Sequence, residues 1–201
     1  EIIRGPSAIV YGGGAVGGVI NIIDHRIHSE YIGGLIGKYD QSFGGANNQT
    51  SSAFSFDYGH NDNLMFHLNG YKRDSKNIDI PGFSVSKRLS ESDSEFARDK
   101  YGKDTLTNSY NHSGGGSLGV SHLFDGGHTG LAYTNHQVDY GNPLEDGAVM
   151  DLNSRKLDYE LEKNEISSFV SKMKFKLGYS DYDHQELEAD GSVGLEYIDK
   201  G

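Results

Sequence analysis

The sequence of 201 residues contains no cysteine, no tryptophan and only 3 prolines. The absence of cysteine excludes a disulfide framework and a thiolate metal site. No stretch approaches the roughly 18 consecutive apolar residues that a membrane-spanning helix needs. The formal net charge is −11, from 18 Lys and Arg against 29 Asp and Glu, which argues against a nucleic-acid-binding surface. This composition alone is typical of a soluble acidic protein.

Glycine and aromatic residues are abundant, with 28 Gly, 13 Tyr and 9 Phe. The glycines show no three-residue period, so a collagen helix is excluded. A disordered chain would be poor in aromatic residues. Together with Ser and Thr, these residues favour strands and turns over helices.

Apolar and polar residues alternate with a period of two in several segments, as in β-strands with one apolar face. The clearest examples are 53–58, 64–69, 117–121, 131–134, 155–163, 172–179 and 193–197. Residues 31–39 are less regular, and no long segment has the 3.6-residue period of a helix. The sequence therefore predicts an all-β, antiparallel protein.

The predicted connections between these strands alternate in length. Short links at 59–63, 124–127 and 163–168 separate longer ones at about 76–109 and 138–153. Outer-membrane β-barrels sort their connections in this way, with short turns on one side and long loops on the other. In such a barrel only alternate residues face lipid, so low overall hydropathy is expected. We therefore favour a barrel over a soluble β-sandwich, which stays the alternative.

The segment 4–23 is rich in glycine and contains Gly12-x-Gly14-x-x-Gly17, the spacing of a dinucleotide-binding fingerprint. That fingerprint requires a helix to open at its third glycine. Here the β-branched run 19–23 follows, which favours a strand. No Gly-Lys-Ser/Thr motif is present, so a P-loop is also excluded. We interpret the glycines as structural, allowing positive φ and close packing of backbones.

The same segment resembles the end of the plug domain in TonB-dependent outer-membrane receptors. The resemblance lies in an Arg-Gly-Pro…Tyr-Gly…Gly-Gly-Val-Ile-Asn-Ile pattern. Its signature residues are Arg4, Gly5, Pro6, Tyr11, Gly12, Gly17, Gly18 and Asn21. In that family a 22-stranded transmembrane barrel follows the plug. The resemblance implies that residues 1–29 are the C-terminal end of a plug domain and 30–201 the first strands of the barrel. We then expect about 8 of the 22 strands here, in a fragment of a longer protein.

A narrower resemblance is to the zinc-uptake members of this family. It rests on residues 131–133, 140–143, 150–159, 178–184 and 70–73. The Tyr140-Gly141-Asn142-Pro143 element is shared by many metal and ferric-complex receptors. The following stretch 144–149 is short and has no histidine, unlike the His-rich loop that the zinc receptors can carry there.

The resemblance implies a receptor in the bacterial outer membrane, and not an enzyme. Its cargo would be a scarce metal, with zinc or another divalent cation expected and a ferric siderophore or haem as the alternative. Its partners would be membrane lipid and the inner-membrane TonB complex, contacted through an N-terminal part absent from this sequence. No catalytic residues and no cofactor are expected. A secreted β-sandwich or adhesin is a second alternative.

Histidine and carboxylate side chains are the zinc ligands available when cysteine is absent. Two clusters lie near the predicted loops, and neighbouring strands would bring them to the external mouth. The candidate ligands are His136, Asp139, Asp181, Asp183, His184 and Glu186. The alternative is an ordinary solvated acidic surface. His25 and His28, near the end of the predicted plug, are expected to be solvated.

Two neighbouring predicted strands carry opposite charges, one a row of lysines and the other a row of acidic residues. Lys172, Lys174 and Lys176 face the acidic residues Asp158, Glu160 and Glu162 in the predicted pairing. We expect cross-strand ion pairs inside a wet lumen, with a basic track for an anionic ferric complex as the alternative. Residues 84–104 carry both charges and are predicted to form a mobile external loop that closes over ligand.

Overall fold

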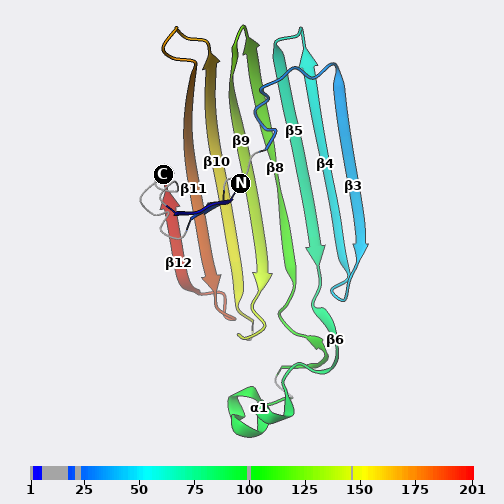
Figure 1. The fold of residues 1–201 in the computed structure, drawn as a ribbon. Helices are drawn as coiled ribbons and strands as arrows, with labels where there is room; N and C mark the ends of the chain where they lie inside the picture. The colour runs from blue at the N-terminus through cyan, green and yellow to red at the C-terminus, as the bar shows by residue number, and fades with distance from the viewer. Residues whose placement is uncertain (1, 6–17, 21–23, 99–100, 146) are drawn as a thin grey trace.

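One eight-stranded antiparallel sheet dominates the computed structural model (Figure 1). The model describes residues 2–5, 18–20, 24–98, 101–145 and 147–201. Neighbouring strands follow the order β12-β11-β10-β9-β8-β5-β4-β3, so the chain meanders from one edge of the sheet to the other. The sheet is open, with β3 and β12 at its two edges. The prediction of an all-β, antiparallel architecture is confirmed.

The eight strands are long. They are β3 (Leu35–Gly44), β4 (Gln49–His60), β5 (Leu64–Ser75), β8 (Asn111–Phe124), β9 (Gly127–Gly141), β10 (Val149–Asn164), β11 (Lys172–Leu187) and β12 (Val193–Lys200). Their pairing is continuous, apart from an irregularity between Glu186 and Leu187 where β11 meets β12.

The connections at the two ends of the sheet differ, but less than the sequence predicted. One end has the turns 61–63, 125–126 and 165–171, and we call it the turn end. The opposite end has the connections 45–48, 76–110, 142–148 and 188–192, and we call it the loop end. The predicted loop 138–153 was too long, because β9 and β10 continue pairing up to Gly141 and Val149. Most of the asymmetry therefore comes from the single connection 76–110.

That long connection contains structure of its own (Figure 1). A two-stranded sheet joins β6 (Ile78–Phe83) to β7 (Lys103–Leu106), and between them lie α1 (Lys87–Ser92) and η2 (Ser94–Phe96). Ser86 caps α1 by accepting a hydrogen bond from the Leu89 amide. No helix in the described ranges has the length and apolarity that crossing a membrane requires.

One face of the sheet is apolar toward the turn end. Residues that pair directly across neighbouring strands share a face, and two consecutive rows of such residues are apolar on six strands. The rows are Phe56-Leu68-Leu118-Tyr133-Leu157-Tyr179 and Tyr58-Phe66-Val120-Leu131-Tyr159-Leu177. Most of these side chains are exposed; Leu118 keeps 57% of its accessible surface. We call this the apolar face.

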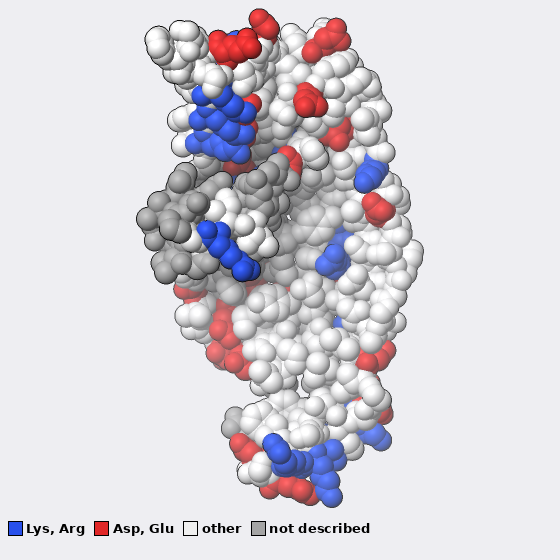
Figure 2. Space-filling model, viewed as in Figure 1, with Lys and Arg blue, Asp and Glu red and all other residues white. Residues whose placement is uncertain are grey.

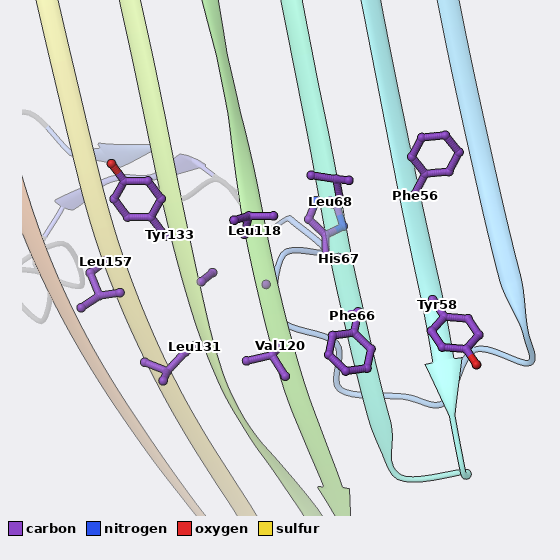
Figure 3. Close-up of a pocket in the computed structure, with 12 residues that line it drawn as sticks. Phe56, Tyr58, Phe66, His67, Leu68, Leu118, Val120, Leu131, Tyr133 and Leu157 are labelled. Atoms are coloured by element: carbon purple, nitrogen blue, oxygen red, sulfur yellow. The ribbon is translucent and has the colours of Figure 1, made fainter.

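The apolar character stops part of the way along the strands. On β10, Leu157, Tyr159 and Leu161 point to the apolar face, whereas the alternate positions Asp151, Asn153 and Arg155 are polar. On β11 the apolar positions run from Met173 to Tyr179, which is roughly 20 Å of strand. The apolar side chains therefore form a band that covers the turn-end part of the face. Figure 3 shows its centre, a shallow hollow of about 560 Å³ across β4, β5, β8, β9 and β10.

Behind the apolar band, the opposite face carries mostly polar and small side chains, such as Asp57, His67, Gly119, Ala132 and Asp158, and residues 24–34 lie across it before β3 begins. We call residues 24–34 the link and this side of the sheet the link face. Upstream of the link, β1 (Ile2–Ile3) pairs with β2 (Val19–Ile20) in a separate antiparallel sheet. Figures 1 and 2 view the molecule from the link face.

Candidate functional site

The link is bonded to the sheet at several points, and the first is Arg26. Its guanidinium Nη1 donates to Thr134 Oγ1 at 2.6 Å and to Asp158 Oδ2 at 2.9 Å. Its Nε donates to Asp24 Oδ2 at 2.7 Å within the link itself. Lys156 Nζ lies 2.9 Å from the other Asp158 oxygen, so both oxygens of this half-buried carboxylate are paired. Arg26 thereby joins the link to β9 and β10.

The second point of attachment is His28, which is 7% exposed. Its amide donates to Ser121 Oγ at 2.8 Å, and its ring Nε2 lies 2.8 Å from Asp57 Oδ1. His67 Nδ1 lies 2.6 Å from the same Asp57 oxygen. The expectation that His25 and His28 are solvated is confirmed for His25, which is exposed, and wrong for His28. No local signal in the sequence indicated this burial, because Asp57 and His67 are distant in the chain.

Small residues on β8 allow the link to lie directly against the sheet. The positions of β8 that face the link are Ser113, Gly115, Ser117, Gly119 and Ser121. A Cβ atom at Gly119 would lie 1.8 Å from the carbonyl oxygen of Arg26. Glycine is therefore required there for the backbones to meet. Further along the link, the Gly59 amide donates to the Gly34 carbonyl at 2.9 Å.

A polar recess of about 600 Å³ lies beside the link, between β5, β8 and β9. Tyr71 on β5 shares a hydrogen bond with His136 on β9, passing over β8 at Gly115, which has no side chain to block it. Ser117 Oγ, buried at the edge of this recess, has no hydrogen-bond partner within the described residues. His136, a predicted metal ligand, is thus engaged with a tyrosine here.

The six predicted metal ligands are divided between the two faces of the sheet. Strand alternation places His136, His184 and Glu186 on the link face and the other three, Asp139, Asp181 and Asp183, on the opposite face. Asp139 lies 3.1 Å from His112, and Asp181 lies 3.5 Å from Lys200. All six therefore cannot surround one ion. Metal binding by a smaller set stays a prediction.

The structure does bring carboxylates together at the loop end, as the sequence suggested. A hydrogen bond to the Glu145 carboxyl raises the pKa of Glu186, and the nearby charge of Glu188 raises it further. The cationic form of His184 acts in the opposite direction. Glu145 belongs to the loop 142–148 and Glu188 to the loop 188–192, so two loops meet here.

The predicted ladder of ion pairs is present near the turn end. Lys172 Nζ lies 2.6 Å from Glu162, Lys174 Nζ 2.7 Å from Glu160, and Lys176 Nζ 2.9 Å from Glu160. Figure 2 shows this basic cluster on the link face over β11. Asp158 is the exception, because it pairs with Arg26 and Lys156 instead of the lysines of β11.

Among the residues that the structure describes, one group of three has the composition and spacing of a metal site, His28, Asp57 and His67. Their candidate ligand atoms lie within 4.8 Å of one another. This group was not predicted from the sequence. Whether this group binds a metal ion or is held by hydrogen bonds depends on which ring nitrogens of the two histidines carry protons.

The plug-like signature lies mostly outside the described residues. The signature residues outside the described ranges are Pro6, Tyr11, Gly12, Gly17 and Asn21. Those that the structure describes are Arg4, Gly5 and Gly18. Gly5 and Gly18 both have positive φ, of 77° and 127°. A Cβ at Gly18 would lie 2.8 Å from the Ile3 carbonyl oxygen, so glycine serves both the backbone conformation and the close β1–β2 approach.

A comparison of the sequence with models of known protein families finds no match.

Proposed function

We propose that this chain is the end of a plug and the first strands of the barrel wall in a TonB-dependent outer-membrane receptor for zinc or another divalent cation. The observation that carries the proposal is the placement of the link. It leaves the plug-like signature and crosses the polar face of a sheet whose other face bears a band of exposed apolar side chains. A polar interior with chain inside it and an apolar exterior are what a plugged barrel requires.

The two faces also favour this reading over a secreted sandwich. A sandwich covers its apolar face with a second sheet. In the described part of the chain, no second layer covers the apolar face, and the link packs on the polar one. A bilayer would cover the band without further protein, since every interior strand has its backbone hydrogen bonds satisfied by neighbours. The unpaired edges at β3 and β12 would then be completed by later strands of a longer chain.

The choice of cargo rests on the narrower resemblance and on the loop-end carboxylates. Glu145, Glu186 and His184 offer oxygen and nitrogen ligands of the kind that a divalent cation accepts. A ferric-siderophore or haem receptor of the same fold is the other candidate. The basic ladder does not favour it, because all three lysines are paired with Glu160 or Glu162.

Uptake in the native organism tests the class and the cargo together. We expect deletion of the gene for the full-length receptor to lower zinc accumulation and growth under zinc limitation, and inactivation of TonB to have the same effect. Normal zinc uptake with failed growth on a ferric siderophore or haem would assign the other cargo. A protein recovered soluble and monomeric, with no effect on either, would contradict the receptor class.

Zinc titration of the purified full-length receptor tests the loop-end site. We expect Glu186→Gln and His184→Ala to weaken zinc binding, since both residues lie on the link face, Glu186 beside Glu145 and His184 close to Glu186. Asp183→Asn is the matched control, because it removes a charge at the adjacent position of the same strand but on the other face. Equal affinities in all three variants would remove this site from the proposal while leaving the receptor class untouched.

A further inference from the structure

The cluster of His28, Asp57 and His67 joins three separate segments in a buried place. His28 comes from the link, Asp57 from β4 and His67 from β5. The side chains of both histidines are at most 7% exposed, and that of Asp57 is 17% exposed. Both rings approach a single oxygen, Asp57 Oδ1, at 2.8 and 2.6 Å. The question is whether this group holds a metal ion or is complete as it stands.

The protons in the cluster are fixed by Asn69. The backbone amide of Ser117 can only donate, and it lies 3.0 Å from Asn69 Oδ1. The Asn69 amide nitrogen must therefore be the atom 2.8 Å from His67 Nε2, to which it donates. His67 Nε2 then carries no proton, so Nδ1 carries it and donates to Asp57. His67 is held as one neutral tautomer.

This arrangement opposes a metal ion. If His67 bound a metal through Nδ1, its Nε2 would carry the proton and would need an acceptor beyond it, as metal-bound histidines have. Here Nε2 faces the Asn69 amide nitrogen, which is a donor. Rotating the Asn69 side-chain amide by 180° to present its oxygen would break the hydrogen bond that this oxygen accepts from the Ser117 backbone amide. By contrast, the hydrogen-bonded form leaves no partner unsatisfied: the ionised Asp57 accepts from His67 Nδ1 and from His28 Nε2.

The rest of the link is fastened in the same manner. Arg26 is paired with Asp158 on β10, the His28 amide is bonded to Ser121 on β8, and the Gly34 carbonyl is bonded to β4. The Gly119 position brings the link backbone into direct contact with the sheet. Side chains and backbone therefore hold the link at both of its ends.

We propose that residues 24–34 are a fixed strap, closed by a metal-free His28–Asp57–His67 latch. The inference rests on the proposed receptor function, and it specifies how that receptor moves. Any displacement of the plug during transport ends at Asp24, and the strap stays on the barrel wall throughout.

Hydrogen exchange on the full-length receptor in membranes tests the strap. The His28 amide reports the latch and the Gly59 amide reports the end of the strap, because they donate to Ser121 Oγ and to the Gly34 carbonyl. We expect their protection to be the same in the resting receptor and in the receptor incubated with zinc and the energised TonB complex. Loss of protection in the energised state would overturn the proposal. His28→Ala should raise exchange at position 28 by about tenfold in the resting state, which shows that the probe responds to the latch.

A disulfide across the strap gives an independent reading. The sequence has no cysteine, and a Cβ at Gly130 would lie 2.6 Å from Ile27 Cγ2, which places the two Cβ atoms within about 4 Å. In the Ile27→Cys/Gly130→Cys receptor we expect zinc uptake to be the same before and after oxidation. Uptake lost on oxidation and restored by reductant would show that the strap must move. If this variant does not fold, the exchange experiment still decides.

Zinc stoichiometry tests the latch itself. We expect His28→Ala and wild-type receptor to bind the same number of zinc ions, and one ion fewer in the variant would overturn the metal-free assignment. A wild-type receptor that takes up no zinc would contradict the proposed cargo. That result would leave the strap proposal untouched, because the exchange protection of the His28 and Gly59 amides is measured independently of zinc uptake.

Discussion

Arg26 and Asp158 form an ion pair of 2.9 Å, although they are 132 residues apart in the sequence. Both side chains are one-fifth exposed. The pair joins the start of the link to β10, so it forms only when the link is packed against the sheet.

Replacing Arg26 with Ala should destabilise the folded protein by about 1–2 kcal/mol, because Asp158 loses a charged donor in a partly buried place. Unfolding by urea in detergent micelles measures the change. The Arg26→Ala/Asp158→Ala double variant should show a coupling between the two sites. Lys156→Ala is the control: Lys156 contacts the same carboxylate but is 47% exposed, so its loss should cost less. An equal cost for both would show that the link contact adds nothing.

Replacing Gly119 with Ala should displace the link. The added Cβ would meet the Arg26 carbonyl oxygen at 1.8 Å, and the backbone of the link leaves it no space. We expect a loss of about 1–3 kcal/mol and faster hydrogen exchange in the link. Gly114→Ala, on the same strand, is the matched control, because its nearest neighbour, the Tyr71 carbonyl oxygen, is 3.5 Å away. Equal stability of the two variants would show that the link does not press on β8.

Replacing Leu131 with Arg tests the membrane assignment of the apolar face. Leu131 lies in the middle of the band, where an arginine facing lipid costs about 2–4 kcal/mol. Refolding into liposomes should therefore be impaired. Gln137→Arg, on the same face of β9 but beyond the band, should refold as wild type does. If Leu131→Arg instead gave a better-behaved soluble protein, the face would be covered by water or protein and not by lipid.

Replacing Glu186 with Gln should remove a pH dependence at the loop end. The Glu145 carboxyl raises the pKa of Glu186 in the folded state, so the folded state binds this proton more tightly than the unfolded state does. The stabilisation is present at low pH and is lost as the pH rises through the raised pKa. Exchange at the amides of Ala148 and Gly191 should therefore speed up with pH beyond its intrinsic rate.

The Glu186→Gln variant should show only the intrinsic rate increase, because its side chain at this position has no carboxyl to ionise. Asp183→Asn, on the opposite face of β11, should keep the wild-type pH dependence. Zinc added at neutral pH should slow exchange in the wild-type loops if the carboxylates bind it. A Glu186→Gln variant that retains the pH dependence would assign it to another group.

The sequence predicted the fold most accurately where one face of a strand is apolar. In β11, alternation from Met173 to Tyr179 located the strand and its faces correctly. The strand continues to Leu187, but the residues beyond Tyr179 are mostly polar on both faces, so the alternation disappears while the pairing does not. The same change in β10 made the predicted loop 138–153 too long. The alternation of apolar and polar residues depends on the surroundings of the two faces of a strand. Where both faces are polar, the alternation is lost and the strand cannot be located from it.

The fastening of the link could not be predicted in this way. His28 looked like a solvated histidine because its neighbours in the chain are polar, and its burial depends on Asp57 and His67. The role of Gly119 also depends on a backbone that is distant in sequence. Charge patterning did predict the ladder of β10 and β11, because those strands are consecutive and their register follows from a short turn.

The attachments of the link to separate strands also impose an order on assembly. The latch residues Asp57 and His67 lie on β4 and β5, and the His28 amide bonds Ser121 of β8; these strands all precede β9 and β10 in the chain. Arg26 must wait for Asp158, and so for β10. The latch can therefore close before β9 and β10 have joined the sheet, whereas the Arg26–Asp158 pair cannot form until β10 is in place. Formation of the Arg26–Asp158 pair therefore shows that the sheet has grown as far as β10.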